Sequence, residues 1–101
     1  MLKSKQHQIV LSLDPSGILT VDRPSVRVSR RDTIRWTSDL PFAVEFTPSS
    51  PCDRLKGSSS GGSLKMKVRG DSGPGRYEYF VAVYDGHRVV TEDPVIIIEA
   101  V

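Results

Sequence analysis

The chain has 101 residues, of which 38% are hydrophobic and 26% are charged, and its formal net charge is +2 at pH 7. This length fits one domain spanning residues 1–101 and excludes two domains, and the composition excludes a disordered chain. The single cysteine, Cys52, excludes an internal disulfide. No run approaches the about 20 apolar residues that a membrane-spanning helix needs.

The N-terminal segment Met-Leu-Lys-Ser-Lys-Gln-His becomes polar at once and lacks the apolar region of a signal peptide. We therefore expect a cytoplasmic protein. A periplasmic or secreted location applies instead if a leader sequence was removed.

Short apolar runs, separated by turn residues, recur along the first half of the chain. Residues 9–13 form the first run, and residues 14–17 (Asp-Pro-Ser-Gly) after it are a strong turn signal. Apolar and polar residues then alternate across 26–29 and 33–36, on either side of a corner at 30–32. Alternation with a period of two predicts strands with one buried face and one wet face. The strands expected in this half are residues 9–13, 18–21, 26–29 and 33–36.

The second half holds the clearest strand pattern and the longest polar stretch. Leu64, Met66 and Val68 alternate with basic residues, which predicts a half-exposed strand. Residues 77–84 are apolar on both faces apart from one glutamate, which suits a central strand. Residues 48–63 are polar with a serine–glycine run in the middle, so we expect a mobile loop there. Further short strands are expected at residues 42–46, 89–90 and 95–98.

These elements amount to seven to nine short strands, and no segment of useful length has the period of a helix. Strands of this length, separated by frequent turns, pack most naturally as two sheets face to face. The sequence therefore predicts an all-β, two-sheet Greek-key sandwich.

Three segments, in their order and spacing, resemble the cupredoxin family. Residues 24–36 are similar to the family's early hairpin, with Arg31 in place of the corner glycine. Residues 41–46 (Pro-Phe-Ala-Val-Glu-Phe) are similar to the family's Pro-His-x-Val-x-Phe strand. Residues 75–81 are similar to its Gly-x-Tyr-x-Phe-x-Cys strand, and residues 94–98 fit its closing strand. The resemblance implies a cupredoxin-like sandwich.

The family's usual task is electron transfer through a blue copper ion, held by two histidines, a cysteine and a weak axial ligand. At the matching positions this chain has Phe42 for the first histidine, Val81 for the cysteine and Tyr84 near the second histidine. Phenylalanine and valine carry no donor atom, so we expect neither metal nor cofactor. The remaining side chains of ligand type occur in the wrong order, and of these we expect Met66 in the core and His87 in a solvated turn. The four residues are His7, Cys52, Met66 and His87.

Arginines cluster in the predicted early hairpin, residues 23–35. Alternation predicts Arg27 and Arg35 pointing outward on adjacent strands, with Arg30 and Arg31 at the corner between them. Guanidinium groups bind carboxylates and phosphates, but the same pattern fits a solvated face paired with nearby carboxylates. In the resembled family the end that bears the ligand strand is also the docking surface, and here we expect an apolar patch there. The predicted partner-binding residues are Arg27, Arg30, Arg31, Arg35, Leu40 and Tyr84.

No catalytic group stands out: there is no carboxylate pair in a cleft motif, no serine with a base and no phosphate-binding loop. We therefore predict a non-enzymatic, copper-free domain that acts as a protein-binding or structural module. Two alternatives stay open. One is a metal-binding electron-transfer protein with a non-standard site. The other is a nucleic-acid-binding module that uses the arginine hairpin, although no exposed aromatic set accompanies the arginines.

Overall fold

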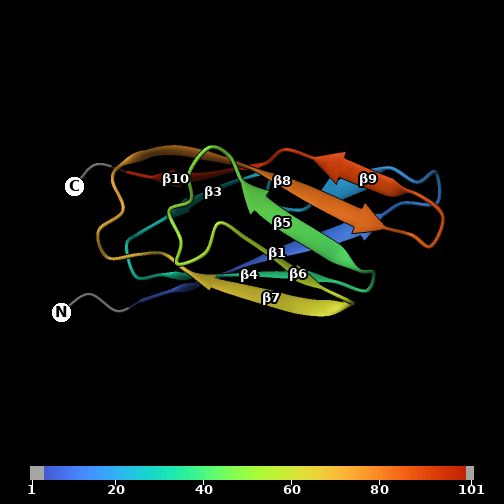
Figure 1. The fold of residues 1–101 in the computed structure, drawn as a ribbon, viewed down its shortest axis with the longest axis horizontal. Coiled ribbons are helices and arrows are strands. Elements are labelled where there is room, and N and C mark those ends of the chain that lie inside the picture. The colour runs from blue at the N-terminus through green and yellow to red at the C-terminus, as the bar shows by residue number, and fades with distance from the viewer. Residues whose placement is uncertain (1–3, 100–101) are drawn as a thin grey trace.

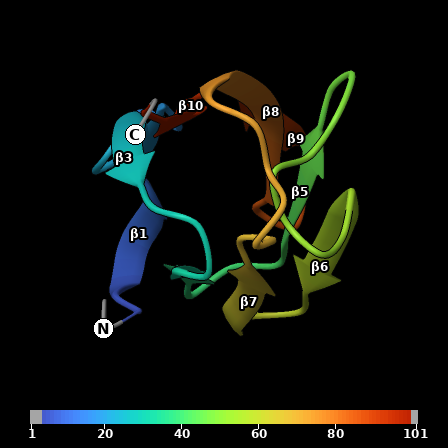
Figure 2. The same cartoon turned by 90° about the vertical axis from the view of Figure 1, so that its left-hand side faces the viewer.

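The structure, a computed structural model, describes residues 4–99. Within that range all regular secondary structure consists of β-strands. Ten strands form two sheets that enclose one interior, as the view along the long axis in Figure 2 shows. The predicted all-β sandwich is confirmed, with ten strands where seven to nine were expected. Residues 4–99 contain no helix long and apolar enough to cross a membrane.

The first sheet has four strands, with parallel strands at its centre. β1 runs parallel to β4, and the outer strands β2 and β7 are antiparallel to their neighbours. β2 meets only the later part of β1, so the first residues of β1 have no strand on that side within residues 4–99. In spatial order the sheet contains β2 (Leu19–Val21), β1 (Gln6–Leu13), β4 (Thr33–Ser38) and β7 (Gly62–Lys67).

The second sheet is built around β8, the longest strand (Figure 1). Its first half pairs with β10 and its second half with β9, while β5 pairs with it on the other side. Pro94 lies between β9 and β10, and its carbonyl accepts the Tyr79 N–H at 3.1 Å, which carries the pairing across the break. The members are β3 (Ser25–Val28), β10 (Val95–Ile98), β8 (Gly75–Tyr84), β5 (Phe42–Phe46), β6 (Lys56–Ser59) and β9 (Val89–Glu92).

A cluster of three buried aromatic rings joins the sheets. Trp36 comes from β4 of the first sheet, and Phe46 and Tyr79 come from the second. The Trp36 ring centroid lies 5.6 Å from that of Tyr79 and 6.3 Å from that of Phe46, both edge-on. The Trp36 indole N–H donates to the Tyr79 hydroxyl at 3.2 Å, so the one polar group of the tryptophan is satisfied inside the core.

The predicted early hairpin is wrong, because β3 and β4 lie in different sheets. β3 pairs with β10, while β4 pairs with β1 and β7. The corner after Val28 carries the chain from one sheet to the other (Figure 1). Alternation had assigned the buried faces of both strands correctly, but a face pattern does not identify the neighbouring strand.

Residues 48–63, expected to form a mobile loop, contain strand β6 and a packed segment that leads to it. β6 pairs with β5 over four residues, and Ser50 and Cys52 are buried. The Pro51 carbonyl accepts the Arg69 N–H at 2.9 Å and the Ser72 hydroxyl at 2.5 Å. A polar segment thus joins the sheet through its backbone groups, which is why its side chains gave no strand pattern.

Gly57 allows β6 to approach the core. A Cβ atom at this position would lie 2.8 Å from Leu64 Cδ1, too close for any side chain to fit without movement. Gly57→Val is therefore expected to lower the free energy of unfolding by about 2 kcal/mol. Ser58→Val on the outer face of the same strand is the matched control and should cost nothing, because valine suits an exposed strand position. Equal chemical-denaturation midpoints for the two variants would contradict this close approach.

Candidate functional site

The six residues predicted to bind a partner do not form one surface. β4 has six residues and is therefore about 20 Å long. Arg30 and Arg31 are in the corner before β4, and Leu40 is in the loop after it, so they lie near opposite ends of this strand. Arg27 and Arg35 belong to opposite sheets. The two apolar residues do share an end of the molecule, and the Tyr84 N–H donates to the carbonyl of Pro41, next to Leu40, at 2.9 Å. Leu40 itself packs against the core.

The arginines have separate surroundings. Arg27 pairs with Glu99 at 2.9 Å, and within residues 4–99 it alone of the four has a carboxylate within 4 Å. Arg30 Nε donates to the Ser72 carbonyl at 2.6 Å and so ties the corner to a neighbouring turn. Arg35 lies on the central strand of the first sheet, and its Nε is buried without a hydrogen-bond partner in the described structure. A common basic face is therefore absent from this set.

Arg31 occupies a position where the resembled family has glycine. The backbone conformation at Arg31 explains why glycine suits this position. Its φ angle is +72°, the left-handed region that glycine enters freely and other residues enter at a cost of about 1 kcal/mol. Its N–H donates to the Val68 carbonyl at 3.0 Å, which holds the corner in place. The sequence departs from the family's pattern while the backbone keeps a conformation suited to glycine.

The outer face of the second sheet carries a shallow apolar depression of about 370 Å³, which we call the alanine groove. Ala43 and Ala82 are cross-strand partners, and Ser58 faces Ala43 from β6, so a row of small side chains crosses three strands. Toward the end of the strands the next pair, Tyr84 and Val89, is larger and projects outward. The lining residues are Pro41, Phe42, Ala43, Ala82, Tyr84, Val89 and residues 58–60.

Exposure distinguishes the alanine groove from the core behind it. Tyr84 is 46% exposed and Val89 is 61% exposed, and Phe80, further along the same face, is 49% exposed. The central strand predicted at residues 77–84 is confirmed, but its outer apolar side is uncovered. Tyr84 was identified from the sequence, whereas Ala43, Ala82 and Val89 were missed because small residues and single valines carry no local signal of a surface.

The side chains of ligand type are dispersed. Cys52 is buried beside Val68, and burial, with a smaller contribution from Asp53, raises the pKa of its thiol to about 12. It is therefore a neutral thiol at pH 7 and a poor metal ligand. Met66 lies in the core and His87 in an exposed turn, as expected. No group of three histidine, cysteine, aspartate or glutamate side chains is placed to hold a metal in residues 4–99.

No protein-family model matches the chain, and no curated protein matches its sequence. Among solved structures, a purple cupredoxin from Nitrosopumilus maritimus superposes with a TM-score of 0.56, over 92% of this chain and 99% of that one. The fold is cupredoxin-like. With 14% identical residues, the similarity concerns the fold alone.

The residues at the copper positions of this cupredoxin-like domain do not fit a blue copper centre. Phe42 is buried and faces Val83 across the strands, while Val81 is buried opposite Val44. None of these side chains has a donor atom. The Tyr84 hydroxyl projects outward and donates to the Gly86 carbonyl at 3.0 Å. Of the three residues at positions that resemble the family's ligand positions, Phe42 and Val81 are therefore part of the hydrophobic core and Tyr84 is exposed, and they do not provide a blue copper ligand set.

Proposed function

We propose that this cupredoxin-like domain is a non-enzymatic protein-binding module that receives an apolar segment of its partner in the alanine groove. The observation that carries the proposal is the groove itself: a row of small side chains bordered by the exposed Tyr84 and Val89. Contiguous exposed apolar surface of this kind is typical of protein interfaces, where aromatic residues supply much of the binding energy.

The chemistry of the surroundings supports binding rather than catalysis or electron transfer. Phe42 and Val81, at the positions that resemble those of the first histidine and the cysteine of a copper site, are buried and apolar, and the Cys52 thiol is neutral and buried. Arg27 and Arg35 belong to opposite sheets, which argues against the single basic face that the nucleic-acid alternative requires. The exposed Phe80 and Tyr84 lie on the sheet opposite Arg35, so stacking and charge do not act together there.

Affinity capture from the source cell supplies the partner, and calorimetric titration with variants of the groove then tests the proposal. Tyr84→Ser and Val89→Ser are each expected to weaken binding at least about tenfold. Ala82→Arg, which fills the floor of the alanine groove, should abolish binding. Thermal unfolding should change little for the two serine variants because both side chains are exposed.

The matched control is Val10→Ser, which removes an exposed valine from the outer face of the other sheet. Its affinity should equal that of the parent. Should the partner bind all three groove variants as tightly as the parent, the interface lies elsewhere on the domain.

A further inference from the structure

The outer face of the first sheet carries positive charge without any acidic side chain beside it. Burial alternates along β1, β4 and β7, so every second side chain of these strands points away from the core. The outward residues include three cations and no aspartate, glutamate or aromatic residue. They are Gln6, Gln8, Val10 and Ser12 of β1, Thr33, Arg35 and Thr37 of β4, and Ser63, Lys65 and Lys67 of β7.

Strand register brings the three cations together. Arg35 and Lys65 are direct cross-strand partners, and Lys67 follows Lys65 by two residues on the same face. Directly opposed side chains have Cβ atoms about 5 Å apart, and like charges in that arrangement repel each other. Strands β4 and β7, which carry them, lie side by side (Figure 1). We call Arg35, Lys65 and Lys67 the cationic face.

No carboxylate in residues 4–99 lies within 4 Å of a charged group of the cationic face. Asp53 lies at the edge of β7, but its carboxylate accepts the backbone N–H of Lys67 at 3.2 Å. Arg54, next to it, donates to the Lys65 carbonyl and adds a further cation at this edge. The repulsion between Arg35 and Lys65 is therefore not offset by an ion pair within the described part of the chain.

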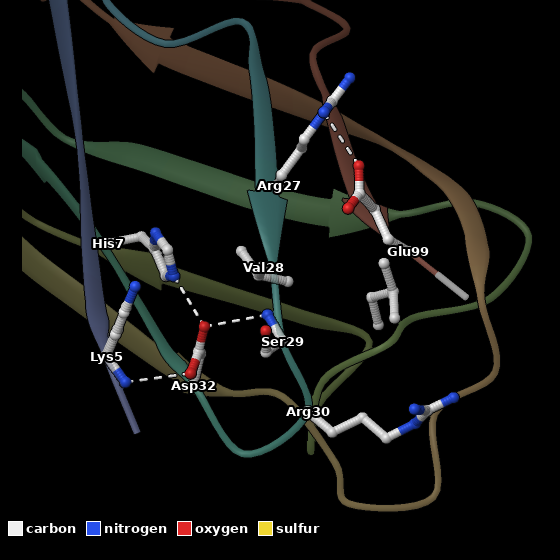
Figure 3. A pocket seen from close by; sticks show the side chains of 9 residues that line it. Lys5, His7, Arg27, Val28, Ser29, Arg30, Asp32 and Glu99 are labelled. Carbon is white, nitrogen blue, oxygen red and sulfur yellow. Dashed lines mark hydrogen bonds and ion pairs between the residues drawn. The ribbon is translucent and has the colours of Figure 1, made fainter. Parts of the chain in front are cut away.

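The seam between the two sheets differs in this respect. There Arg27 pairs with Glu99 at 2.9 Å, and the carboxylate of Asp32 lies 2.8 Å from His7 Nε2 (Figure 3). Both acidic groups at the seam have basic partners, so the charges are balanced. The cationic face is thus the more open place for an anionic partner.

A shallow depression of about 600 Å³ gives a partner access to Arg35, which is one of its lining residues. Thr37 and Ser63 also line it and are direct cross-strand partners, so two hydroxyl groups lie one row beyond Arg35 and Lys65. Asp39, in the loop after β4, is the one acidic lining residue and forms no ion pair with Arg35. A carboxylate that enters here meets a guanidinium and hydroxyl donors.

From this pattern we propose that the cationic face binds an extended acidic segment of a partner protein, with carboxylates at alternate positions. Side chains on one face of an extended chain recur about every 7 Å, which is also the spacing of Lys65 and Lys67 along β7. One carboxylate of the segment lies against Arg35 and Lys65 and the next against Lys67. Their negative charges offset the repulsion between Arg35 and Lys65.

A peptide fits this surface better than a nucleic acid does. Single-stranded nucleic acid binds through stacking on aromatic side chains together with basic groups, and the outward residues of β1, β4 and β7 include no aromatic ring. The cationic face lies on the first sheet and the alanine groove on the second, so this proposal does not depend on the function proposed for the groove.

Two peptides of equal composition and charge test the proposal. One alternates glutamate and serine, and the other repeats the unit Glu-Glu-Ser-Ser, which never places two glutamates two positions apart. Both have blocked termini and a neutral fluorophore, and fluorescence anisotropy at low ionic strength measures binding. The alternating peptide should bind about threefold more tightly, and its affinity should fall as salt is added.

Variants locate the binding surface. Arg35→Gln and Lys65→Gln should each weaken binding of the alternating peptide about threefold. Lys56→Gln, on the outer face of the second sheet, is the charge-matched control and should bind as the parent does. Lys65→Gln should not lower the thermal unfolding midpoint, because it removes a repulsion, so its weaker binding is not a folding defect.

The proposal is overturned if neither peptide binds, if both bind equally, or if Lys56→Gln weakens binding as much as Lys65→Gln does. Tighter binding of an oligothymidylate of the same net charge would also overturn it, because the partner would then be a nucleic acid.

Discussion

Replacing Asp32 with alanine is expected to lower the free energy of unfolding by about 3 kcal/mol. The substitution leaves the Lys5 and Ser29 N–H groups and the His7 ring without the acceptor that joins the start of β1 to the corner before β4. Urea denaturation followed by circular dichroism measures the change. Asp39→Ala removes an exposed aspartate and should shift the unfolding free energy by less than about 0.5 kcal/mol. Equal effects of the two substitutions would show that the Asp32 contacts contribute nothing specific.

The same residue sets an expected pH dependence. The pKa of Asp32 is lowered in the folded protein, because its hydrogen bonds outweigh the opposing effect of burial. Its stabilisation is therefore complete above the pKa of the unfolded chain, about 4, and is lost as the pH falls through the lower folded value. The stability difference between the parent and Asp32→Asn should be constant near neutrality and shrink below about pH 4.

Trp36→Ala is expected to have the largest effect of any single substitution considered, about 4 kcal/mol. The substitution leaves a cavity in the core between the two sheets, and it removes the N–H that donates to the buried Tyr79 hydroxyl. Trp36→Phe keeps most of the volume and should cost about half as much, which makes the effect measurable if the alanine variant does not fold. Circular dichroism is the readout, since Trp36 is the single tryptophan. Phe80→Ala, on the exposed outer face, is the control and should lower the free energy of unfolding by less than about 1 kcal/mol. If Trp36→Ala lowered it by no more than Phe80→Ala does, the buried aromatic cluster would not be a main source of stability.

Local alternation was enough to predict which residues face the interior. Ile34 and Trp36 in β4, and Leu64 and Met66 in β7, are all buried as their spacing required. The pairing of strands could not be predicted in the same way. β1 lies beside β4 and β3 beside β10 in parallel pairs that are far apart in the chain, and side-chain period contains no information about such partners.

The strand within the polar stretch before β7 was missed for a different reason. β6 (Lys56–Ser59) is an edge strand held by backbone hydrogen bonds to β5, so its side chains need not alternate in polarity. Gly57 weakened the strand signal further, although its lack of a side chain is what the packing against Leu64 demands. Composition predicted a mobile loop over residues 48–63, and within that range the structure has an edge strand with a closely packed glycine.

The candidate sites were predictable only where a single residue carried the signal. Tyr84 is large, aromatic and outward-facing, and it borders the alanine groove. The pair of His7 and Asp32 is separated by 25 positions and belongs to no sequence motif, so nothing in the linear sequence connected the two residues. The arginines formed a cluster along the chain that the crossing between sheets then divided.

The order of strands in the two sheets also determines when this domain can fold. β1, the first strand, lies between β2 and β4, and β10, the last, lies between β3 and β8. The pairs β1–β2 and β8–β9 join consecutive strands, but β1–β4 and β3–β10 join distant segments, and β3 has no strand neighbour until residues 95–98 have been synthesised. A nascent chain that emerges from the ribosome holds an incomplete second sheet with an exposed apolar edge until its final strand arrives. The second sheet is therefore complete only once residues 95–98 are available, and we expect its folding rate to be limited by contacts between distant parts of the chain.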